Sequence, residues 1–564
     1  MFHLKYFRID SYAFVALTLI VLAVVLRIVL VSLGWPSIDS DEGTMGIMAL
    51  HIAYHGEYPI FFYGQGYMGS LEAYLAAIAF HIIGPSVLAL RLGVLLMFAC
   101  FLGSMYLLTS LLYTKKLAVV TLVILSFGPT ELLFHQLEAA GGYPETLLFG
   151  AVLLLYASWL ALSTNQKATL PNRKWRLIAY AGFGCIVGIA IWSDILILPF
   201  IIMACLLIVV FCRQEMRLVG ILFLVLGFTL SILPTIIYNL TVPLNQGSFA
   251  ILGIIFTHDP TGHVVSQPSL LQKIGGTLLV SLPLATGASV ICPISPGDAW
   301  PLSAQSSSYT LQCTVVHGLW GLGSIVLWTI AVVLAVRYYW KARRQSLVRV
   351  GTSAEERQAA IRQFARLMVL ASAGLALLIY LLSAPSALDP WAGSRYLVGL
   401  QIATPAVIAP LWGMADKIKL QSTLARIMMA LRYGIIVLII GTFLLGTIST
   451  FDLTPGAYTK TQQQAALVHN LMQMGVTHIY TDYWTCDRIA FQSSEQIVCS
   501  VLDEQLQPGQ NRYAPYEASV SNDLHAAYVF PVPSPQATAF ASKEAGLHGN
   551  YQRFTIDGYV VYLI

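Results

Sequence analysis

Three carboxylates lie within a few residues of one another near the start of the chain, at Asp39, Asp41 and Glu42. An apolar run at 12–34 directly precedes them and is long enough to cross a bilayer. Charged groups beside hydrocarbon are costly, so a cluster at this boundary indicates a polar site that faces water. We expect Asp41 to be its chemical centre. The alternative is that Asp41 and Glu42 only begin a helix, where acids favour the positive end of the helix dipole.

Further polar residues lie at other predicted membrane boundaries on the same side. Glu138 and Glu145 flank a Gly-Gly-Tyr-Pro segment, Asp194 lies in a short turn, and Arg395 precedes a later apolar run. The two glutamates are expected either to belong to a site or to face water at the interface. Asp194 is either functional or simply the polar residue that a tight turn requires.

The composition defines the class of protein. Of 564 residues, 57% are hydrophobic and only 10% are charged, and the mean hydropathy is +0.72. A chain with so little polar surface cannot cover a soluble globule of this length. The net charge of +4 is small and is spread over many short loops, which argues against a nucleic-acid partner. We therefore expect a polytopic membrane protein.

Apolar runs of about 20 residues predict about eleven transmembrane helices. Alternating sides from a cytoplasmic N-terminus places most Lys and Arg residues in inner loops, and only Lys273 and Arg395 in outer loops between spans. This charge bias predicts a multi-pass plasma-membrane protein with its N-terminus, including Lys5 and Arg8, in the cytoplasm. The expected spans are 12–34, 86–113, 117–134, 144–163, 177–193, 195–212, 218–240, 318–340, 367–384, 396–413 and 433–451.

The polar and longer segments all fall on the outer side. The expected transmembrane domain is 1–453, with a first outer loop at 35–85 and a large one at 241–317. Two short helical segments in the first loop, near 42–54 and 71–84, are expected to lie along the outer membrane surface.

The tail at 454–564 changes in character and is expected to form a small extracytoplasmic α/β domain. Helical periodicity is followed by short apolar or alternating runs between turn residues. The expected helix is 462–474 and the expected strands are 477–481, 495–499, 526–530 and 559–564.

Four of the eight cysteines lie in the outer segments as two local pairs, Cys292 with Cys313 and Cys486 with Cys499. Two disulfides in an oxidising compartment are expected on this basis. Four free thiols are the alternative, because sequence alone does not assign connectivity.

A series of motifs runs through the membrane part of the chain: Asp41-Glu42 after an anchor span, the Gly/Tyr-rich segment 64–72, Gly84-Pro85, 89–92, 138–145 and 394–397. Together they resemble the GT-C glycosyltransferases, and within them the bacterial branch related to protein O-mannosyltransferases and lipid A aminoarabinose transferases. The likeness covers the membrane part, about 450 residues. It differs from the aminoarabinose transferases where a lysine and paired prolines are replaced by Gln65, Tyr67 and Glu72.

The resemblance implies transfer of a sugar, with inversion, from a polyprenyl-phosphate carrier to an acceptor hydroxyl on the extracytoplasmic face. Asp41 matches the family's catalytic aspartate and is expected to act as general base. Glu42 is expected to orient the site or help to hold a cation, and Arg395 to bind the departing phosphate. The expected catalytic residues are Asp41 and Glu42; the expected substrate-binding residues are Asp39, Gln65, Tyr67, Glu72, Glu138, Tyr143, Glu145, Asp194, Arg395 and Tyr396.

No cofactor is expected to be required. Asp39 and Asp41 have the D-x-D form, whose oxygen ligands suit Mg²⁺ or Mn²⁺, but the resemblance implies that the reaction does not depend on such an ion. His51 and His55 are four residues apart, although no glutamate follows the first histidine as in zinc proteases.

The expected partners are the polyprenyl-phosphate sugar donor, membrane lipid, and a glycan, lipid or protein acceptor. Aromatic residues at Tyr483-Trp484 and 511–516 are either sugar-stacking faces or ordinary exposed residues of the tail. Two other functions stay open: a transporter or flippase of lipid-linked glycans, and a non-catalytic glycan-binding membrane protein. The absence of an internal repeat and the one-sided placement of the acids argue against transport.

Overall fold

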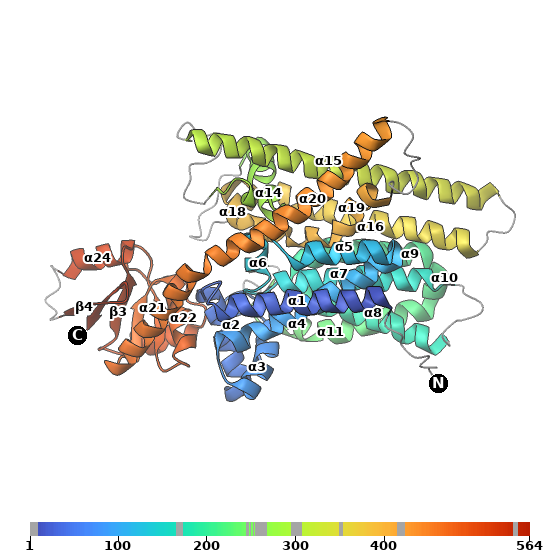
Figure 1. The fold of residues 1–564 in the computed structure, drawn as a ribbon. Coiled ribbons are helices and arrows are strands. Elements are labelled where there is room, and N and C mark those ends of the chain that lie inside the picture. Colours follow the sequence, from blue (N-terminus) through green and yellow to red (C-terminus); the bar gives the residue numbers. More distant parts are fainter. Residues whose placement is uncertain are drawn as a thin grey trace.

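A helical bundle carries a small mixed sheet at one end (Figure 1). The structure, a computed structural model, describes residues 10–164, 173–243, 247–248, 250–251, 253, 268–294, 307–348, 354–413, 423–544 and 551–563. Lys5, Arg8 and part of the predicted outer loop 241–317 lie outside the described residues.

Eight helices among the described residues are long and apolar enough to cross a membrane. They correspond to eight of the expected spans, which confirms a polytopic helical protein. Their bounds are α1 (Ser11–Ser32), α4 (Val87–Leu112), α7 (Tyr143–Leu162), α8 (Arg173–Ser193), α11 (Ile221–Thr241), α15 (Ser308–Val348), α16 (Ala354–Leu382) and α20 (Thr423–Asp452), which leads into α21 (Thr454–Gln473).

The other three expected spans are shorter or interrupted. In the first of them Pro129, which lacks a backbone N–H donor, lies between two helices. The pairs of segments are α5 (Lys115–Ser126) with α6 (Thr130–His135), the 3₁₀ turn η2 (Ile195–Ile197) with α9 (Leu198–Phe211), and the 3₁₀ helix η7 (Ser394–Ala403) with α19 (Thr404–Gly413).

Shorter elements connect these helices. The first outer segment contains α2 (Ser40–Leu50), the π-helical turn η1 (His51–His55) and α3 (Leu71–Ile83). The remaining elements are α10 (Arg213–Glu215), η3 (Met216–Gly220), α13 (Leu270–Gly276), η5 (Thr277–Ser281), α14 (Leu282–Thr286), η6 (Ala288–Val290), α17 (Pro385–Leu388) and α18 (Pro390–Gly393).

The C-terminal sheet has five strands in the order β2-β1-β3-β5-β4. β1 pairs in parallel with β2 and β3, whereas β5 is antiparallel to β3 and β4. Four expected strands are confirmed, with β2 beginning at Val498, and the unpredicted β4 is almost wholly exposed and has no apolar alternation. The bounds are β1 (His478–Thr481), β2 (Val498–Val501), β3 (Ala527–Pro531), β4 (Gln552–Ile556), β5 (Tyr559–Leu563), α22 (Tyr483–Gln492), α23 (Ala514–Ser521) and α24 (Pro535–Glu544).

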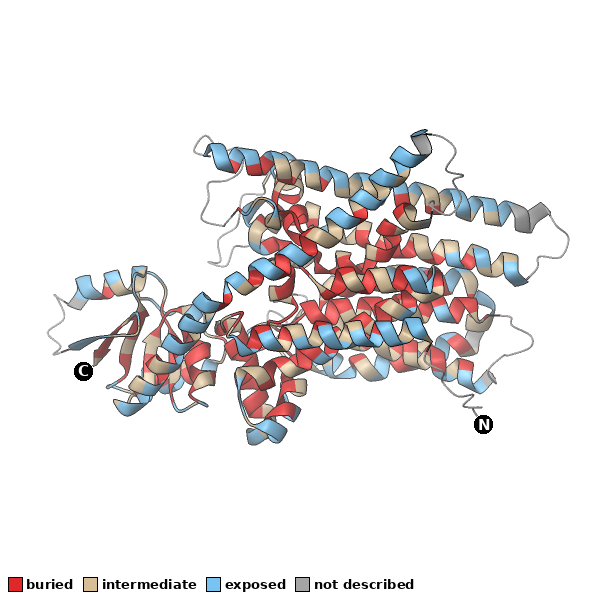
Figure 2. Cartoon of the chain, in the orientation of Figure 1, coloured by how far each residue is buried: buried red, intermediate tan, exposed pale blue. Residues whose placement is uncertain are grey.

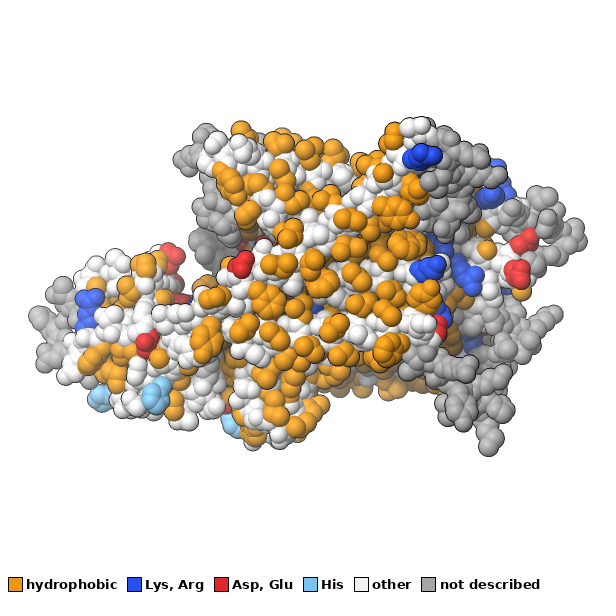
Figure 3. Space-filling view, in the orientation of Figure 1, with side chains coloured by type: hydrophobic (Ala, Val, Ile, Leu, Met, Phe, Trp, Pro, Cys, Tyr) orange, Lys and Arg blue, Asp and Glu red, His pale blue; other side chains and the backbone are white. Residues whose placement is uncertain are grey.

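The surface of the bundle is apolar along its length. Large hydrophobic side chains such as Phe14, Leu319 and Val437 are more than half exposed, and α1, α15 and α20 each show long exposed faces (Figure 2). Exposed apolar faces of this extent are typical of helices that contact lipid. On the face drawn in Figure 3, most Lys and Arg side chains gather at the end of the bundle far from the sheet. The predicted membrane orientation was based on such an uneven distribution of Lys and Arg between the two ends. Which end is cytoplasmic stays a prediction.

Both expected disulfides are present. Cys292–Cys313 joins the segment after η6 to α15, and Cys486–Cys499 joins α22 to β2. The other four cysteines are free.

Candidate active site

The α2 helix is buried, and this corrects the expectation that it lies along the membrane surface. Of its residues Ser40–Leu50, only Asp41 is partly exposed. α2 packs on α22 of the C-terminal region so closely that a Cβ on Gly43 would lie 2.5 Å from the Arg488 backbone nitrogen. Thr44 also donates a hydrogen bond to Asp487 at 2.6 Å. The sheet domain therefore covers the helix that carries the three acids.

Asp41 contacts the C-terminal region directly. Its Oδ1 accepts hydrogen bonds from Arg512 Nη2 at 2.8 Å and from the Tyr483 hydroxyl. Arg512 Nε also donates to the Tyr483 oxygen at 2.8 Å. Among the described residues, no donor bonds Asp41 Oδ2, and the side chain is 25% exposed. Asp41 is thus held through one oxygen and offers the other.

Gln65 lies beside the same guanidinium. With its amide oxygen turned toward Arg512, it accepts two hydrogen bonds from that side chain, at 2.8 and 3.0 Å. Arg512 is 9% exposed and lies over the Phe62 ring, 5.2 Å from its centroid. Arg512 thus connects Gln65, which was predicted to bind substrate, to Asp41. The sequence did not single out Arg512 for such a role.

Glu42 lies in a different environment. It is 1% exposed and both its oxygens contact Arg91, at 2.7 and 2.6 Å. Its Oε1 also accepts from the Ala139 backbone N–H at 3.1 Å. These contacts fix α2 against α4 and the 138–142 turn, which agrees with an orienting role and leaves Glu42 no free oxygen for a substrate.

Asp39 and Glu138 lie close enough for each to influence the pKa of the other. Asp39 also caps α2 by accepting from the Glu42 backbone N–H at 2.9 Å. Burial raises the pKa of both carboxyls, and each is raised further by the acids beside it. Among the described residues, no group of three or more potential metal ligands includes Asp39 or Asp41.

A second acid pair lies under the turn that leads into α7. Glu72 accepts from the Gly141 backbone N–H at 2.9 Å. Its other oxygen and both oxygens of Glu145 are buried and have no hydrogen-bond partner among the described residues. Burial, and then Glu145, raise the pKa of Glu72. Both glutamates are at most 1% exposed, so they shape the turn from inside.

Asp194 contacts the same turn from another side. A Cβ on Gly142 would lie 2.1 Å from Asp194 Oδ2, so only glycine allows the carboxylate to approach this closely. Asp194 also accepts from the Leu196 backbone N–H at 2.7 Å. Burial raises its pKa to about 6. These contacts fit the second of the two roles that the sequence left open for Asp194, that of the polar residue required by a tight turn.

Arg395 is the cation on the other side of the site. Its guanidinium carbon lies 6.0 Å from the centre of the Tyr143 ring and 5.3 Å from that of Tyr396. Its Nη2 donates to the Tyr396 oxygen at 3.4 Å, and its buried Nε has no hydrogen-bond partner among the described residues. No described carboxylate lies within 4.0 Å of it. A guanidinium without a carboxylate partner is suited to an anionic ligand.

The pKa of the Tyr67 phenol responds to both arginines. Burial, then Tyr396 and Asp194, raise the pKa of its phenol, whereas Arg512 and Arg395 both lower it.

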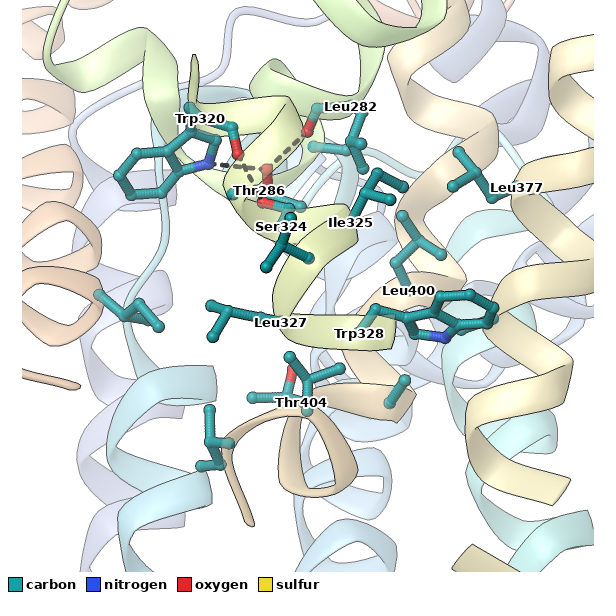
Figure 4. Close-up of a pocket in the computed structure, with 18 of the residues that line it drawn as sticks. Leu282, Thr286, Trp320, Ser324, Ile325, Leu327, Trp328, Leu377, Leu400 and Thr404 are labelled. Atoms are coloured by element: carbon teal, nitrogen blue, oxygen red, sulfur yellow. Dashed lines mark hydrogen bonds between the residues drawn. The ribbon is translucent and has the colours of Figure 1, made fainter. Parts of the chain in front are cut away.

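An apolar cavity of about 800 Å³ lies beside η7 (Figure 4). η7 begins near Arg395 and reaches the cavity at Leu400, a distance of about 10 Å along a 3₁₀ helix. The Trp320 indole donates to Thr286 at 2.9 Å, and almost all the other contacts there are apolar. The labelled lining residues are Leu282, Thr286, Trp320, Ser324, Ile325, Leu327, Trp328, Leu377, Leu400 and Thr404.

The structure thus brings the predicted residues together at one end of the bundle. Asp41, Gln65, Tyr67, Arg395 and Tyr396 are partly exposed there, whereas the other acids are mostly buried beneath them. Sequence reasoning missed Arg512 and the contact of Tyr483 with Asp41. Arg512 lies 471 residues from Asp41, and no local pattern marks such a pair.

The fold and the site define a polytopic helical membrane protein with a small appended sheet domain. No protein-family model and no curated protein sequence matches the chain. Among solved structures, ArnT from Cupriavidus metallidurans bound to undecaprenyl phosphate is 10% identical, with a TM-score of 0.55 and 97% of each chain covered. The same protein in the apo state is 11% identical, with a TM-score of 0.52 and coverage of 96% of this chain and 97% of that one.

These two structures confirm the expected fold over nearly the whole chain. An archaeal oligosaccharyltransferase from Archaeoglobus fulgidus is also similar, at 13% identity and a TM-score of 0.48, with 98% of this chain and 75% of that chain covered. At such low identity the likeness is one of fold, so the reaction must be argued from the side chains.

Proposed function

We propose that this protein is an inverting glycosyltransferase that moves a sugar from a polyprenyl-phosphate carrier to an acceptor hydroxyl at the extracytoplasmic end of the bundle. The observation that carries the proposal is that the candidate site offers both a carboxylate with a free oxygen, Asp41, and a guanidinium with no carboxylate partner among the described residues, Arg395. The apolar cavity beside η7 is suited to an isoprenoid chain.

Asp41 acts as the general base in this proposal. Arg512 and Tyr483 hold its Oδ1, so Oδ2 faces the acceptor and takes the hydroxyl proton as the acceptor oxygen attacks the anomeric carbon. One positioned base contributes about 10² to 10⁴ in rate. A single displacement inverts the anomeric configuration.

Arg395 acts on the departing group. As the bond between the anomeric carbon and the phosphate oxygen breaks, negative charge grows on the phosphate, and a guanidinium stabilises this charge through two oxygens at once. The Tyr143 and Tyr396 rings, 6.0 and 5.3 Å from its guanidinium carbon, help to hold Arg395 in place. The step uses no Mg²⁺ or Mn²⁺.

The ArnT structure with undecaprenyl phosphate supports this choice of donor class, because that protein shares the fold and binds a polyprenyl phosphate. The donor sugar and the acceptor are left unspecified by the proposal. Glu42, Asp39 and Glu72 act in it as positioning residues, since each accepts a hydrogen bond from the protein.

The test is Asp41→Asn in the full chain, expressed in a strain that lacks the wild-type copy. We expect normal membrane levels, loss of sugar transfer, and accumulation of the sugar-loaded carrier lipid. Glu504→Gln, an exposed acid of the C-terminal region, is the matched control and should behave as wild type. A transporter or a glycan-binding scaffold should tolerate Asp41→Asn, so transfer and lipid levels like those of wild type would reject the proposal.

A further inference from the structure

A cluster of two histidines and a glutamate lies where the first outer segment meets the C-terminal region. His51 and His55 come from η1, and Glu495 comes from the turn between α22 and β2. One ligand atom from each of these three residues lies within 4.8 Å of the other two. The cluster uses neither Asp39 nor Asp41, and the proposed sugar transfer does not need it.

The backbone on both sides aims these side chains at one another. A π-helical turn has more than four residues per turn, so residues four apart face the same side, and the His51 and His55 rings lie 5.2 Å apart. On the other side, Ser494 and Glu495 both have left-handed backbone conformations, with φ of 50° and 63°. Such conformations are costly for residues other than glycine and concentrate at ligand sites.

Hydrogen bonds fix how His51 is oriented. The Tyr63 hydroxyl donates to Glu57 at 3.1 Å, so its oxygen accepts from His51 Nδ1 at 2.8 Å. The Nε2 atom of His51 then points at Glu495 Oε1, 2.7 Å away. A second hydroxyl, that of Tyr516, donates to the same carboxylate at 2.6 Å. A histidine that donates through one nitrogen to an outer partner and presents the other is the usual arrangement of a metal ligand.

We propose that His51, His55 and Glu495 form a site for Zn²⁺ or a similar transition metal. Imidazole nitrogens and a carboxylate are ligands that zinc prefers, and water completes a tetrahedral set. Bonds of about 2.1 Å at tetrahedral angles separate ligand atoms by roughly 3.4 Å. The observed separations bracket this value: 2.7 Å from His51 Nε2 to Glu495 Oε1 and 3.8 Å from His55 Nδ1 to Glu495 Oε2. Small side-chain rotations therefore suffice for binding.

The position of the site gives it a structural role. The histidines belong to the segment that begins with α2, and the glutamate belongs to the region that supplies Arg512. Tyr513 packs on His51 with ring centres 4.9 Å apart, and the preceding residue, Arg512, bonds Asp41. A metal ion here holds the two parts together close to the candidate active site, and the three ligands are positioning residues.

The test is metal binding by the full chain in detergent. Chelator-treated protein is dialysed against Zn²⁺, bound metal is measured by mass spectrometry, and Co²⁺ is used as a spectroscopic probe of tetrahedral geometry. We expect one Zn²⁺ per chain, bound at least 10-fold more weakly after His55→Ala or Glu495→Gln. His55 is half exposed, so its truncation is compatible with folding.

His478→Ala is the matched control, because His478 is a partly exposed histidine of the same region that pairs with a single carboxylate, Asp523, at 2.8 Å. It should keep the wild-type stoichiometry. The proposal is overturned if the wild-type chain holds no stoichiometric Zn²⁺, or if His55→Ala binds as tightly as His478→Ala. Neither measurement depends on sugar transfer, so this proposal and the proposed function fail separately.

Discussion

The acids of the site differ in what their oxygens contact. Asp41 is bonded through one oxygen and partly exposed, whereas Glu42, Glu72 and Glu138 are buried against an arginine, a backbone N–H or another carboxyl. The sequence placed all of these acids at one membrane boundary. It could not rank them, because their partners lie 49 to 471 residues away.

Arg395 should govern affinity for the donor. Arg395→Gln removes the only charge that the proposal assigns to the leaving phosphate, and hydrogen bonds to charged groups contribute about 1.5–3 kcal/mol each. We expect the KM for the donor to rise, or kcat/KM for the donor to fall, roughly 10- to 100-fold. Arg395→Lys should be intermediate, because an ammonium keeps the charge but loses the two-point contact.

The measurement is initial-rate sugar transfer in detergent at varied donor concentration. Arg553→Gln, which removes an exposed cation from β4, is the control and should leave both kinetic constants unchanged. An unchanged KM in Arg395→Gln would show that the phosphate binds elsewhere.

Asp487 should make stability depend on pH. Burial raises its pKa from 3.8 to about 6, although the Thr44 hydroxyl and Arg512 lower it in part. Between these two values the folded chain holds a proton that the unfolded chain has released. Folding is therefore favoured by Asp487 protonation below about pH 4, and this stabilisation is lost as the pH rises through 6. The full effect is at most about 3 kcal/mol.

Asp487→Asn should remove this contribution. We expect the fall in melting temperature between pH 5 and pH 7.5 to become smaller than in wild type, as followed by thermal unfolding in detergent. Glu504→Gln should keep the wild-type slope. An identical slope in Asp487→Asn would mean that the buried carboxyl is ionised throughout this range.

At the scale of elements, the contact between α2 and α22 is the feature that the sequence least predicts. Hydropathy and short length indicated a surface helix at 42–54, whereas the structure buries α2 under the C-terminal region. The residues that permit this are Gly43 and Gly46, the latter against the Phe491 ring. Two glycines three residues apart permit close packing, but they do not indicate which distant helix packs against them.

Gly43→Ala should therefore disturb the candidate active site indirectly, by displacing α22. The added methyl would lie 2.6 Å from the Asp487 carbonyl, so α22 must move, and overpacking of this kind costs about 1–3 kcal/mol. We expect a lower melting temperature and slower sugar transfer, because Tyr483 on α22 bonds Asp41.

Gly434→Ala in α20 is the matched control, since an added Cβ there meets nothing within 4 Å. It should be neutral or stabilise the helix by up to about 1 kcal/mol. Equal effects of the two substitutions would show that close packing of α2 on α22 is not required.

The interruptions in several helices also could not be predicted from the sequence. Apolar runs at 117–134 and 396–413 predicted ordinary spans, but α5 and α6 are separated near Pro129, and η7 has 3₁₀ geometry. The change matters for function, because η7 carries Arg395 and Tyr396 at one end and lines the apolar cavity at the other. Hydropathy measures length and polarity, and it does not report how tightly a segment is wound.

At the scale of the whole molecule, the sequence predicted the helical membrane part, the α/β tail, both disulfides and the gathering of Lys and Arg at the end far from the sheet. Each follows from a local signal: hydropathy, alternation, cysteine spacing or charge bias. The sequence did not predict that the tail completes the site. That depends on Arg512 and Tyr483 reaching Asp41 across the interface, a long-range contact for which one chain gives no pattern.

Removal of 454–564 should therefore separate binding from chemistry. Arg395, Tyr143 and the apolar cavity all lie within the bundle, so the truncated chain should still bind undecaprenyl phosphate, within about threefold of wild type by native mass spectrometry. Without Arg512 and Tyr483, Asp41 loses both donors on Oδ1, and sugar transfer should stop at every donor concentration.

Retained lipid binding shows that the truncated bundle is folded, which makes the loss of transfer interpretable. Arg512→Lys in the full chain tests the same contact with the domain in place. It should slow transfer roughly 10- to 100-fold, because lysine cannot reproduce the separate hydrogen bonds to Asp41, Tyr483 and Gln65. A truncated chain that still transfers sugar would place the reacting groups wholly inside the membrane part, and the C-terminal region would then serve acceptor choice or stability alone.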